Sequence, residues 1–442
     1  MAAVSHIEAS EVALGQSPPN VFCFYVNLAA MSNGPLKNGP EELLPALDKC
    51  THLIYQDTQI SKAFEIQSLR PDIDTEIGLD LYRKITDLKN QFPKLKILIS
   101  ISSAENLEGQ QEIHRCVYMQ KDVKIESIEK SCVDQTVENL RRSLNMVLGL
   151  HENSLQEKLV NSVELFLRKH NFDGVNLAWV FPPNANKPDK IKTSATPPPS
   201  VVDPDPEKSR IGFGKLVDLM SNRLRPANLL TTVMVIPHVD FHVYYDIPTL
   251  NRAADLIIME SHDFPSPSSK YDFVDQSDKK LHYFLEKGAD ASKIIITADS
   301  YGSWSLIKKS DLEDSPNKPK QAPGGIVFYF EVCEQLKALA DPSQHSKKFL
   351  DKLIFVLGDK YFKEAPNSAP GANNPSVPKQ LKDEYAIWLA YEDVQAVAYK
   401  TSYAKQSGLA GIALNVLSFD DARGICSGVK YPLLQTIATS WK

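Results

Sequence analysis

Three ionisable residues follow one apolar segment of the chain at a spacing that suits proton transfer. Glu260, His262 and Asp263 come directly after the apolar run at 256–259. Because alternate side chains of a β-strand point the same way, Glu260 and His262 are expected to face one side. A carboxylate beside an imidazole can act as an acid–base pair. A buried ion pair is the more frequent outcome, and the sequence leaves both interpretations open.

Two further histidines, His238 and His242, lie near the end of another apolar segment, at 229–237. Together with His262 they offer imidazole nitrogens, which bind metal ions or the carboxylates of anionic ligands. Their spacing matches no metal-binding motif. We therefore expect histidines of surface loops and no metal site.

The segment FDGVNLAWVFPP, at 172–183, reads as a buried strand with few groups that could do chemistry. Asn176, Ala178 and Val180 occupy alternate positions and therefore share one face of the strand. Trp179 points the other way, and we expect it to pack between the sheet and the helices. Asp173, at the start of the segment, is its only carboxylate. A valine cannot donate a proton, so this face lacks an acid.

Eight apolar segments of strand length must position these residues. Helical patterns lie between them, and near-continuous runs of Val, Ile and Leu are typical of parallel strands buried on both faces. Eight alternations of strand and helix predict an α/β fold, a (β/α)8 TIM barrel, and no GxGxxG motif follows the first strand to favour an open sheet. The segments are 21–26, 51–55, 96–101, 172–180, 229–237, 255–261, 293–300 and 409–418.

Two segments interrupt this alternation and predict the domain organisation. A Pro-rich loop is expected at 182–210, over the mouth of the barrel. Between the seventh and eighth strands lie about a hundred residues, too many for one helix, which predict a small inserted α+β domain at 305–391. The barrel would then comprise residues 20–304 and 392–442, and residues 1–19 would form an N-terminal extension.

The charge of the chain argues against nucleic acid as a partner. Its 49 basic and 55 acidic residues are spread along the sequence, so no basic face is available to neutralise phosphates. No segment approaches the roughly 18–20 consecutive apolar residues that span a bilayer. We therefore expect neither a nucleic-acid partner nor a membrane span.

The segment 172–182 resembles the fourth-strand signature of glycoside hydrolase family 18, the chitinases, which reads FDGxDxDWEYP. In that family the last acidic residue protonates the glycosidic oxygen, and the preceding aspartate supports attack by the acetamido group of the sugar. Val180 and Ala178 stand at these two positions, and Asn176 replaces the first aspartate. The resemblance covers nearly the whole chain. It is nearest to the imaginal disc growth factors and related chitinase-like proteins of insects, on segments such as CTHLIYQ, YYDIP, EVCEQL and SFDDARGIC.

The resemblance implies a protein without chitinase activity. Acid–base catalysis of this kind is typically worth about 10²- to 10⁴-fold, so Val180 at the acid position predicts that hydrolysis is lost. Sugar-binding barrels also stack pyranose rings on aromatic side chains. Leu28 and Asn415 stand where the family has tryptophans, so weak or no chitin binding is expected.

These replacements would leave a drier mouth, suited to a small apolar or amphipathic ligand such as a pigment or lipid. No other cofactor is expected. The residues predicted to contact such a ligand are Tyr25, Leu28, Asp173, Val180, His238, Glu260, His262, Asp263 and Asn415.

The six cysteines bear on the compartment. The family pairing implies the disulfides Cys23–Cys50 and Cys333–Cys426, and Cys116 with Cys132 would form a third pair by proximity. Disulfides imply an oxidising compartment, so we expect a secreted, extracellular protein. The first 19 residues lack the pattern of a signal peptide, which we therefore expect to have been removed.

Several functions are compatible with this resemblance. The first is a secreted, inactive chitinase-like protein, of insect haemolymph, that binds or carries a small ligand in the barrel mouth. The second is a signalling protein like the imaginal disc growth factors, recognised by a cell-surface receptor. A residual glycan-binding lectin is the third, and a weak enzyme that uses Glu260 and His262 is the last.

Overall fold

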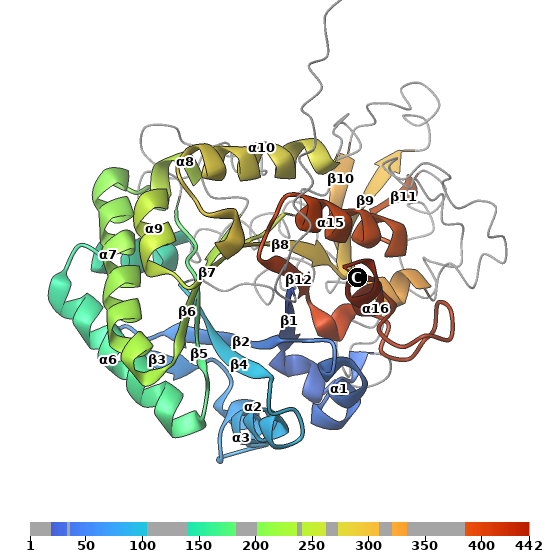
Figure 1. The fold of residues 1–442 in the computed structure, drawn as a ribbon, viewed down its shortest axis with the longest axis horizontal. Helices are drawn as coiled ribbons and strands as arrows, with labels where there is room; N and C mark the ends of the chain where they lie inside the picture. The colour runs from blue at the N-terminus through green and yellow to red at the C-terminus, as the bar shows by residue number, and fades with distance from the viewer. Residues whose placement is uncertain are drawn as a thin grey trace, which may run out of the picture.

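Eight parallel strands form a closed barrel at the centre of the molecule (Figure 1). The computed structural model describes residues 19–32, 36–103, 140–182, 201–236, 241–261, 273–308, 321–333 and 385–441. β1 (Asn20–Val26) pairs with both β2 (His52–Ile60) and β12 (Gly411–Asn415), and this pairing closes the sheet. The prediction of a TIM barrel is confirmed. The remaining barrel strands are β4 (Lys96–Ser102), β5 (Gly174–Ala178), β6 (Leu230–Val235), β7 (Leu256–Met259) and β8 (Ile294–Asp299).

Helices surround the barrel and cover the outer face of its strands (Figure 1). Among the described residues no helix combines the length and the apolar character needed to cross a membrane. A helix at 140–149 precedes α6, and the short β3 (Ile66–Ser68) pairs antiparallel with the end of β2. The longer helices are α1 (Pro40–Leu47), α3 (Leu81–Thr86), α6 (Asn153–His170), α7 (Pro206–Leu224), α9 (Ile247–Ala253), α10 (Phe273–Glu286), α15 (Val394–Gln406) and α16 (Pro432–Ser440).

The barrel strands are buried on both faces, which explains their near-continuous apolar sequences. In β1, Phe22 and Phe24 join a cluster inside the barrel, whereas Cys23 and Tyr25 join the cluster between the strands and the helices. Trp179 belongs to this outer cluster, fully buried with its ring 5.9 Å from that of Phe213 on α7. The predicted core role of Trp179 is therefore confirmed.

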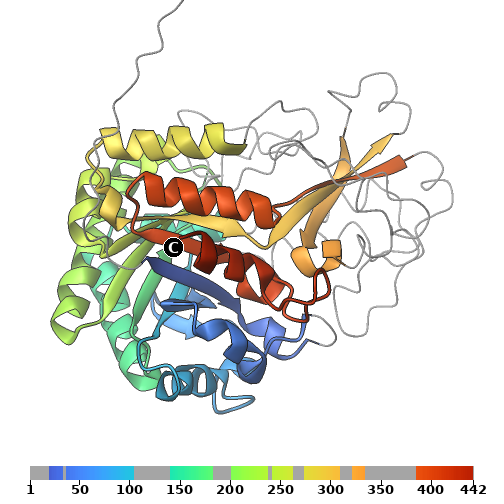
Figure 2. The same cartoon turned by 45° about the vertical axis from the view of Figure 1, so that its right-hand side comes forward.

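A second, three-stranded antiparallel sheet is formed by the chain between β8 and β12. Its order is β10 (Gln321–Phe328), β9 (Tyr301–Lys308), β11 (Tyr385–Ala390). Figure 2 shows this sheet projecting from the barrel beyond the end of β8. β9 already begins at Tyr301, four residues before the predicted insertion. Because most of 309–384 lies outside the described residues, an inserted α+β domain stays a prediction.

The Pro-rich loop ends earlier than predicted, because α7 begins at Pro206. The side chain of Asp205 accepts a hydrogen bond from the backbone N–H of Lys208, and a proline at the first helical position needs no partner for an N–H. Residues 206–210 are therefore helical. The part of this loop at 183–200 lies outside the described residues.

Both disulfides that the family resemblance implies are present in the structure. Cys23–Cys50 joins β1 to the residues just before β2, and Cys333–Cys426 joins the residues just after β10 to the chain after β12. Cys116 and Cys132 lie outside the described residues, so their pairing stays a prediction.

Loss of the Cys23–Cys50 disulfide is expected to destabilise the barrel. The bond closes a loop with a sequence separation of 27. By the chain-entropy relation, a Cys23→Ser/Cys50→Ser variant should lose roughly 3–4 kcal/mol of unfolding free energy. Urea denaturation of the variant and of wild type under non-reducing conditions measures the difference. Equal midpoints, or free thiols mapped to Cys23 and Cys50 in unreduced wild-type protein, would contradict this pairing.

Candidate functional site: the mouth of the barrel

The side chains that face inward at the carboxyl ends of the strands fall into an apolar half and a polar half. Val26, Ala178 and Met234 are buried in the inner cluster, at the ends of β1, β5 and β6. The polar half comes from β7, β8, β12 and the residues that follow them, and comprises Glu260, Asp299, Tyr301 and Asn415. Active sites of TIM barrels form at this end of the strands.

On β5, the side chain of Asn176 is fully buried and hydrogen-bonded on both sides. Its amide nitrogen donates to the hydroxyl of Ser100 on β4 at 3.1 Å, and its carbonyl oxygen accepts from the hydroxyl of Thr232 on β6 at 2.9 Å. A neutral amide that bridges three strands in this way stabilises the barrel. It carries no charge to the mouth.

Val180 lies half-buried just beyond the end of β5. Its backbone N–H donates to the hydroxyl of Ser103 at 2.8 Å, and its carbonyl oxygen accepts from the hydroxyls of Ser103 at 3.0 Å and Ser143 at 2.6 Å. These hydrogen bonds fix the backbone at this position. The side chain that they hold in place is aliphatic and has no proton to donate.

Asn415 connects the polar half of the mouth. Its amide nitrogen lies 3.3 Å from a carboxylate oxygen of Glu260, 3.1 Å from one of Asp299 and 3.3 Å from the hydroxyl of Tyr301. The parallel pairing of β12 with β8 places Asn415 opposite Asp299. Two carboxylates from β7 and β8 thus approach one amide group.

Burial makes both carboxyl groups weak acids. It raises the pKa of Glu260 to about 7, although Lys280 and the hydrogen bonds from Asn415 and Tyr301 oppose the shift. The pKa of Asp299 is raised well above its usual value by burial and by the negative charge of Glu392. A carboxyl group with a pKa near neutrality can donate or accept a proton, so Glu260 is suited to proton transfer among the described residues of the mouth.

A buried ion pair between Lys400 and Glu392 supports this cluster from outside the barrel. The ammonium of Lys400, on α15, lies 2.6 Å from a carboxylate oxygen of Glu392, and their side chains are only 5% and 4% exposed. Lys400 also donates to the backbone carbonyl of Thr297 at 2.9 Å. The backbone N–H of Asp299 donates to Glu392. The pair is therefore fully hydrogen-bonded, which a buried ion pair requires to be stable.

Two predicted mouth residues lie elsewhere, and these predictions are wrong. Tyr25 is buried in the outer cluster, with its ring 5.7 Å from that of Tyr55, because it alternates with the inward-facing Phe24 on β1. Asp173 lies at the amino end of β5, opposite the mouth. There it accepts the backbone N–H of Ile97 at 2.8 Å and forms an ion pair with Lys89.

The structure describes some of the other predicted ligand-binding residues and not others. Leu28, in the 3-10 helix η1 (Asn27–Ala30) that follows β1, contacts both core clusters. His242 is exposed, and its ring packs against that of Tyr283 at 4.2 Å. His238, His262 and Asp263 lie outside the described residues, so the structure does not test the predicted pairing of Glu260 with His262.

Sequence reasoning missed Asp299, Glu392 and Lys400. Asp299 is the last residue of the buried strand β8, and Glu260 directly follows β7. A carboxylate at the carboxyl end of a buried strand was the signal that could have identified Asp299. Nothing in the sequence connects Glu392 and Lys400 with the mouth, because their contacts are made to β8 across about a hundred residues.

The described residues contain one close group of metal-ligating atoms, Cys333, Asp421 and Cys426. The two sulfurs are joined in a disulfide, so they are not thiolate ligands.

Comparison with known proteins agrees with this geometry. Residues 20–420 match the model of glycosyl hydrolases family 18. The chain is 28% identical to chitinase-like protein Idgf1 of Drosophila simulans, over 97% of this chain and 96% of that protein. It is 26% identical to bacteria-responsive protein 1 of Aedes aegypti, over 94% and 93%.

Solved structures share the fold. The Group IV chitinase of Ostrinia furnacalis, in complex with allosamidin, superposes with a TM-score of 0.66 at 19% identity, over 96% of this chain and 98% of that one. Human YKL-39, described as a pseudo-chitinase with retained chitooligosaccharide binding properties, gives 0.60 at 21% identity, over 96% and 99%. The matched family model covers most of the sequence, and the relatives carry chitinase-like names. The chain therefore belongs to glycosyl hydrolases family 18 and matches the imaginal disc growth factor group of chitinase-like proteins.

Proposed function

We propose that this chain is a family 18 protein that does not hydrolyse chitin and that binds a small ligand with an apolar body in the barrel mouth. The observation that carries the proposal is the aliphatic side chain of Val180 at the position of the catalytic acid, next to Ala178 in place of the supporting aspartate. General acid catalysis at this position is worth about 10²- to 10⁴-fold, and valine supplies none of it.

Glu260 is not a direct replacement for the lost acid. It extends from β7, which is separated from β5 by β6, and two strand spacings correspond to about 10 Å. A proton on Glu260 would therefore lie about 10 Å from the place where the family's acid on the fourth strand donates its proton. Its hydrogen bond from Asn415 also holds the carboxyl group toward β8 and β12.

The division of the mouth supports a ligand with both apolar and polar character. Val26, Ala178 and Met234 offer aliphatic surface, and Glu260 offers a carboxyl group that exchanges a proton near neutrality. A pigment, lipid or related molecule with one hydrogen-bonding group would use both halves. The two disulfides support secretion of the protein.

Two alternatives have support in the names of relatives. Imaginal disk growth factor 6 of Drosophila melanogaster, 27% identical to this chain, favours a signalling protein recognised by a receptor. The chitooligosaccharide binding retained by human YKL-39 favours a lectin. The inward position of Asn415, where the family has a tryptophan, offers no ring for a sugar to stack on, so we place ligand carriage first.

The purified protein is expected to leave a fluorogenic chitooligosaccharide intact. Its rate should lie at least about 10²-fold below that of a working family 18 chitinase assayed in parallel, because Val180 cannot protonate the leaving oxygen. Turnover at the rate of the working enzyme would refute the proposal. Weak turnover that disappears in Glu260→Gln but persists in Glu157→Gln, an exposed control on α6, would instead establish Glu260 as a displaced acid.

Protein isolated from its native source is expected to retain a small molecule in the mouth. Native mass spectrometry should show added mass, and Leu28→Arg, which places a cation beside the apolar half, should abolish it. Ile211→Arg, at an exposed apolar position on α7, is the matched control and should keep the mass. A protein that carries no ligand but binds to cells would favour the signalling alternative. Added mass equal to that of a chitooligosaccharide would favour the lectin.

Titration of Glu260 is expected to lower stability as the pH rises from about 4.5 to about 7. In this range the unfolded chain releases the proton of Glu260 while the folded chain keeps it, so the folded state binds more protons and loses free energy with rising pH. Asp299, whose pKa is also raised, contributes in the same direction.

A Glu260→Gln variant should therefore be more stable than wild type at pH 8, by about 1–3 kcal/mol, and the difference should vanish below about pH 4.5. Urea denaturation at several pH values measures it, with Glu157→Gln as the exposed control. Among the described residues, the groups that interact electrostatically with Glu260 include Asn415, Tyr301, Asp299, Lys280 and Tyr245. A difference that does not change with pH would contradict the raised pKa.

A further inference from the structure

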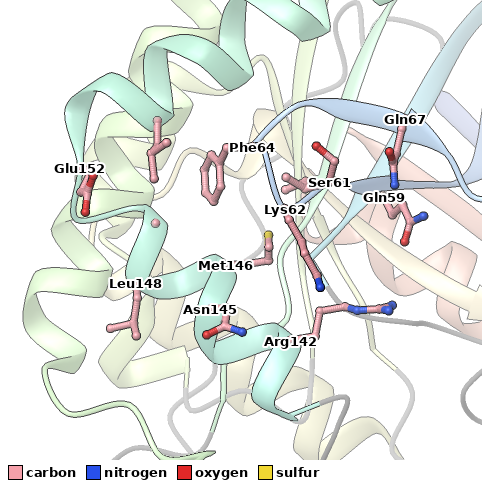
Figure 3. Close-up of a pocket in the computed structure, with 13 residues that line it drawn as sticks. Gln59, Ser61, Lys62, Phe64, Gln67, Arg142, Asn145, Met146, Leu148 and Glu152 are labelled. Carbon is pink, nitrogen blue, oxygen red and sulfur yellow. The ribbon is translucent and has the colours of Figure 1, made fainter.

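A cavity of about 630 Å³ lies at the side of the barrel, apart from the mouth cluster. The turn between β2 and β3 forms one wall, and the helix at 140–149 with the start of α6 forms the other (Figure 3). It is not lined by Glu260, Asp299, Tyr301 or Asn415, the polar residues of the mouth. Ligand pockets usually measure about 300–1,000 Å³, so this cavity has the size of a small-molecule site.

The inner wall of the cavity is apolar and its shape is fixed. Ile60, Phe64 and Met146 line it and are at most 7% exposed. A Cβ atom at Gly149 would lie 2.2 Å from the ring of Phe64, so the ring occupies space that a glycine leaves open. Phe64 has a φ of 60°, a left-handed conformation that is unusual for a bulky residue and that persists only where the surroundings hold it.

Hydrogen bonds hold Phe64 in this conformation. Its backbone N–H donates to the carbonyl of Ser61 at 2.9 Å, and the N–H of Ser61 donates to the carbonyl of Glu65 at 2.8 Å. The turn therefore presents the ring to the cavity in one orientation. A wall of this kind is preorganised, which lowers the cost of binding an apolar group.

One end of the cavity is cationic and rich in hydrogen-bond donors. In Figure 3 the side chains of Lys62 and Arg142 lie on the same side as Gln59 and Gln67, whereas Leu148 and Glu152 lie on the opposite side. Gln59 and Gln67 are register partners in the β2–β3 pair, so their amides are adjacent. Within the described part of the chain Lys62 is exposed and makes no ion pair.

From this arrangement we propose that the cavity binds a small amphipathic carboxylate. The apolar body packs against Phe64 and Met146, and the carboxylate lies beside the ammonium of Lys62, with the amides of Gln59 and Gln67 as further donors. An ammonium binds a carboxylate through charge-assisted hydrogen bonds, which are stronger than hydrogen bonds between neutral groups. The site is formed by other elements than the mouth, so it does not depend on the function proposed above.

Isothermal titration of the full chain with decanoate tests the proposal, with decanol as the matched ligand that lacks the charge. Wild type should bind decanoate, and Lys62→Glu should weaken this binding on the order of tenfold or more, since a charged hydrogen bond is lost and a like charge is added. Lys84→Glu, at an exposed position on α3 outside the cavity, should bind as wild type does. Thermal unfolding verifies that both variants fold.

Three outcomes would overturn the assignment. The first is a wild-type protein that does not bind decanoate. The second is equal binding of decanoate and decanol with no effect of Lys62→Glu, which would leave an apolar cavity without a carboxylate site. The third is binding that is lost in Leu28→Arg and unchanged in Lys62→Glu, which would place the ligand in the mouth and support only the function proposed above.

Discussion

Closure of the barrel by β1 is the constraint on which the rest of the structure depends. Because β1 pairs with β2 on one side and β12 on the other, the two ends of the described chain form adjacent strands. In a closed barrel each side chain faces either the axis or the helices. This alternation places Asn176 and Asn415 on the inside and Tyr25 and Trp179 on the outside. It decides which substitutions alter the site and which alter only packing.

Within that frame the buried carboxyl groups of the described mouth lie on one side of the barrel. β5 ends at Ala178 and brings no carboxylate to the mouth, and the side chain of its Asn176 forms hydrogen bonds between strands. Carboxyl groups instead gather on β7 and β8 around Asn415. Their burial raises their pKa values, so they hold protons more firmly than ordinary carboxylates.

Supporting such a cluster requires groups that are distant in the sequence. Lys400 reaches the carbonyl of Thr297 from α15, and Glu392 accepts the N–H of Asp299. Both charged groups are buried and hydrogen-bonded, an arrangement in which removal of one partner leaves an uncompensated charge. The side cavity has a different origin, since it depends on the turn at Ser61–Glu65 and on the open space at Gly149. The two sites can therefore change independently.

The sequence by itself determined the barrel and, through the family that it resembles, the two disulfides. Strand runs and the segment at 172–182 are local patterns, and the cysteine pairing follows from the family they indicate. The tertiary structure decided what contacts what. Asp173 was predicted as a site residue but lies at the amino end of β5, opposite the mouth. Glu392 and Lys400 gave no local signal, because their partners come from other strands and helices. The alternation of side chains along a strand can be read from the sequence. Which strand ends lie at the mouth, and which side chains of different strands meet there, is fixed only when the sheet closes into a barrel.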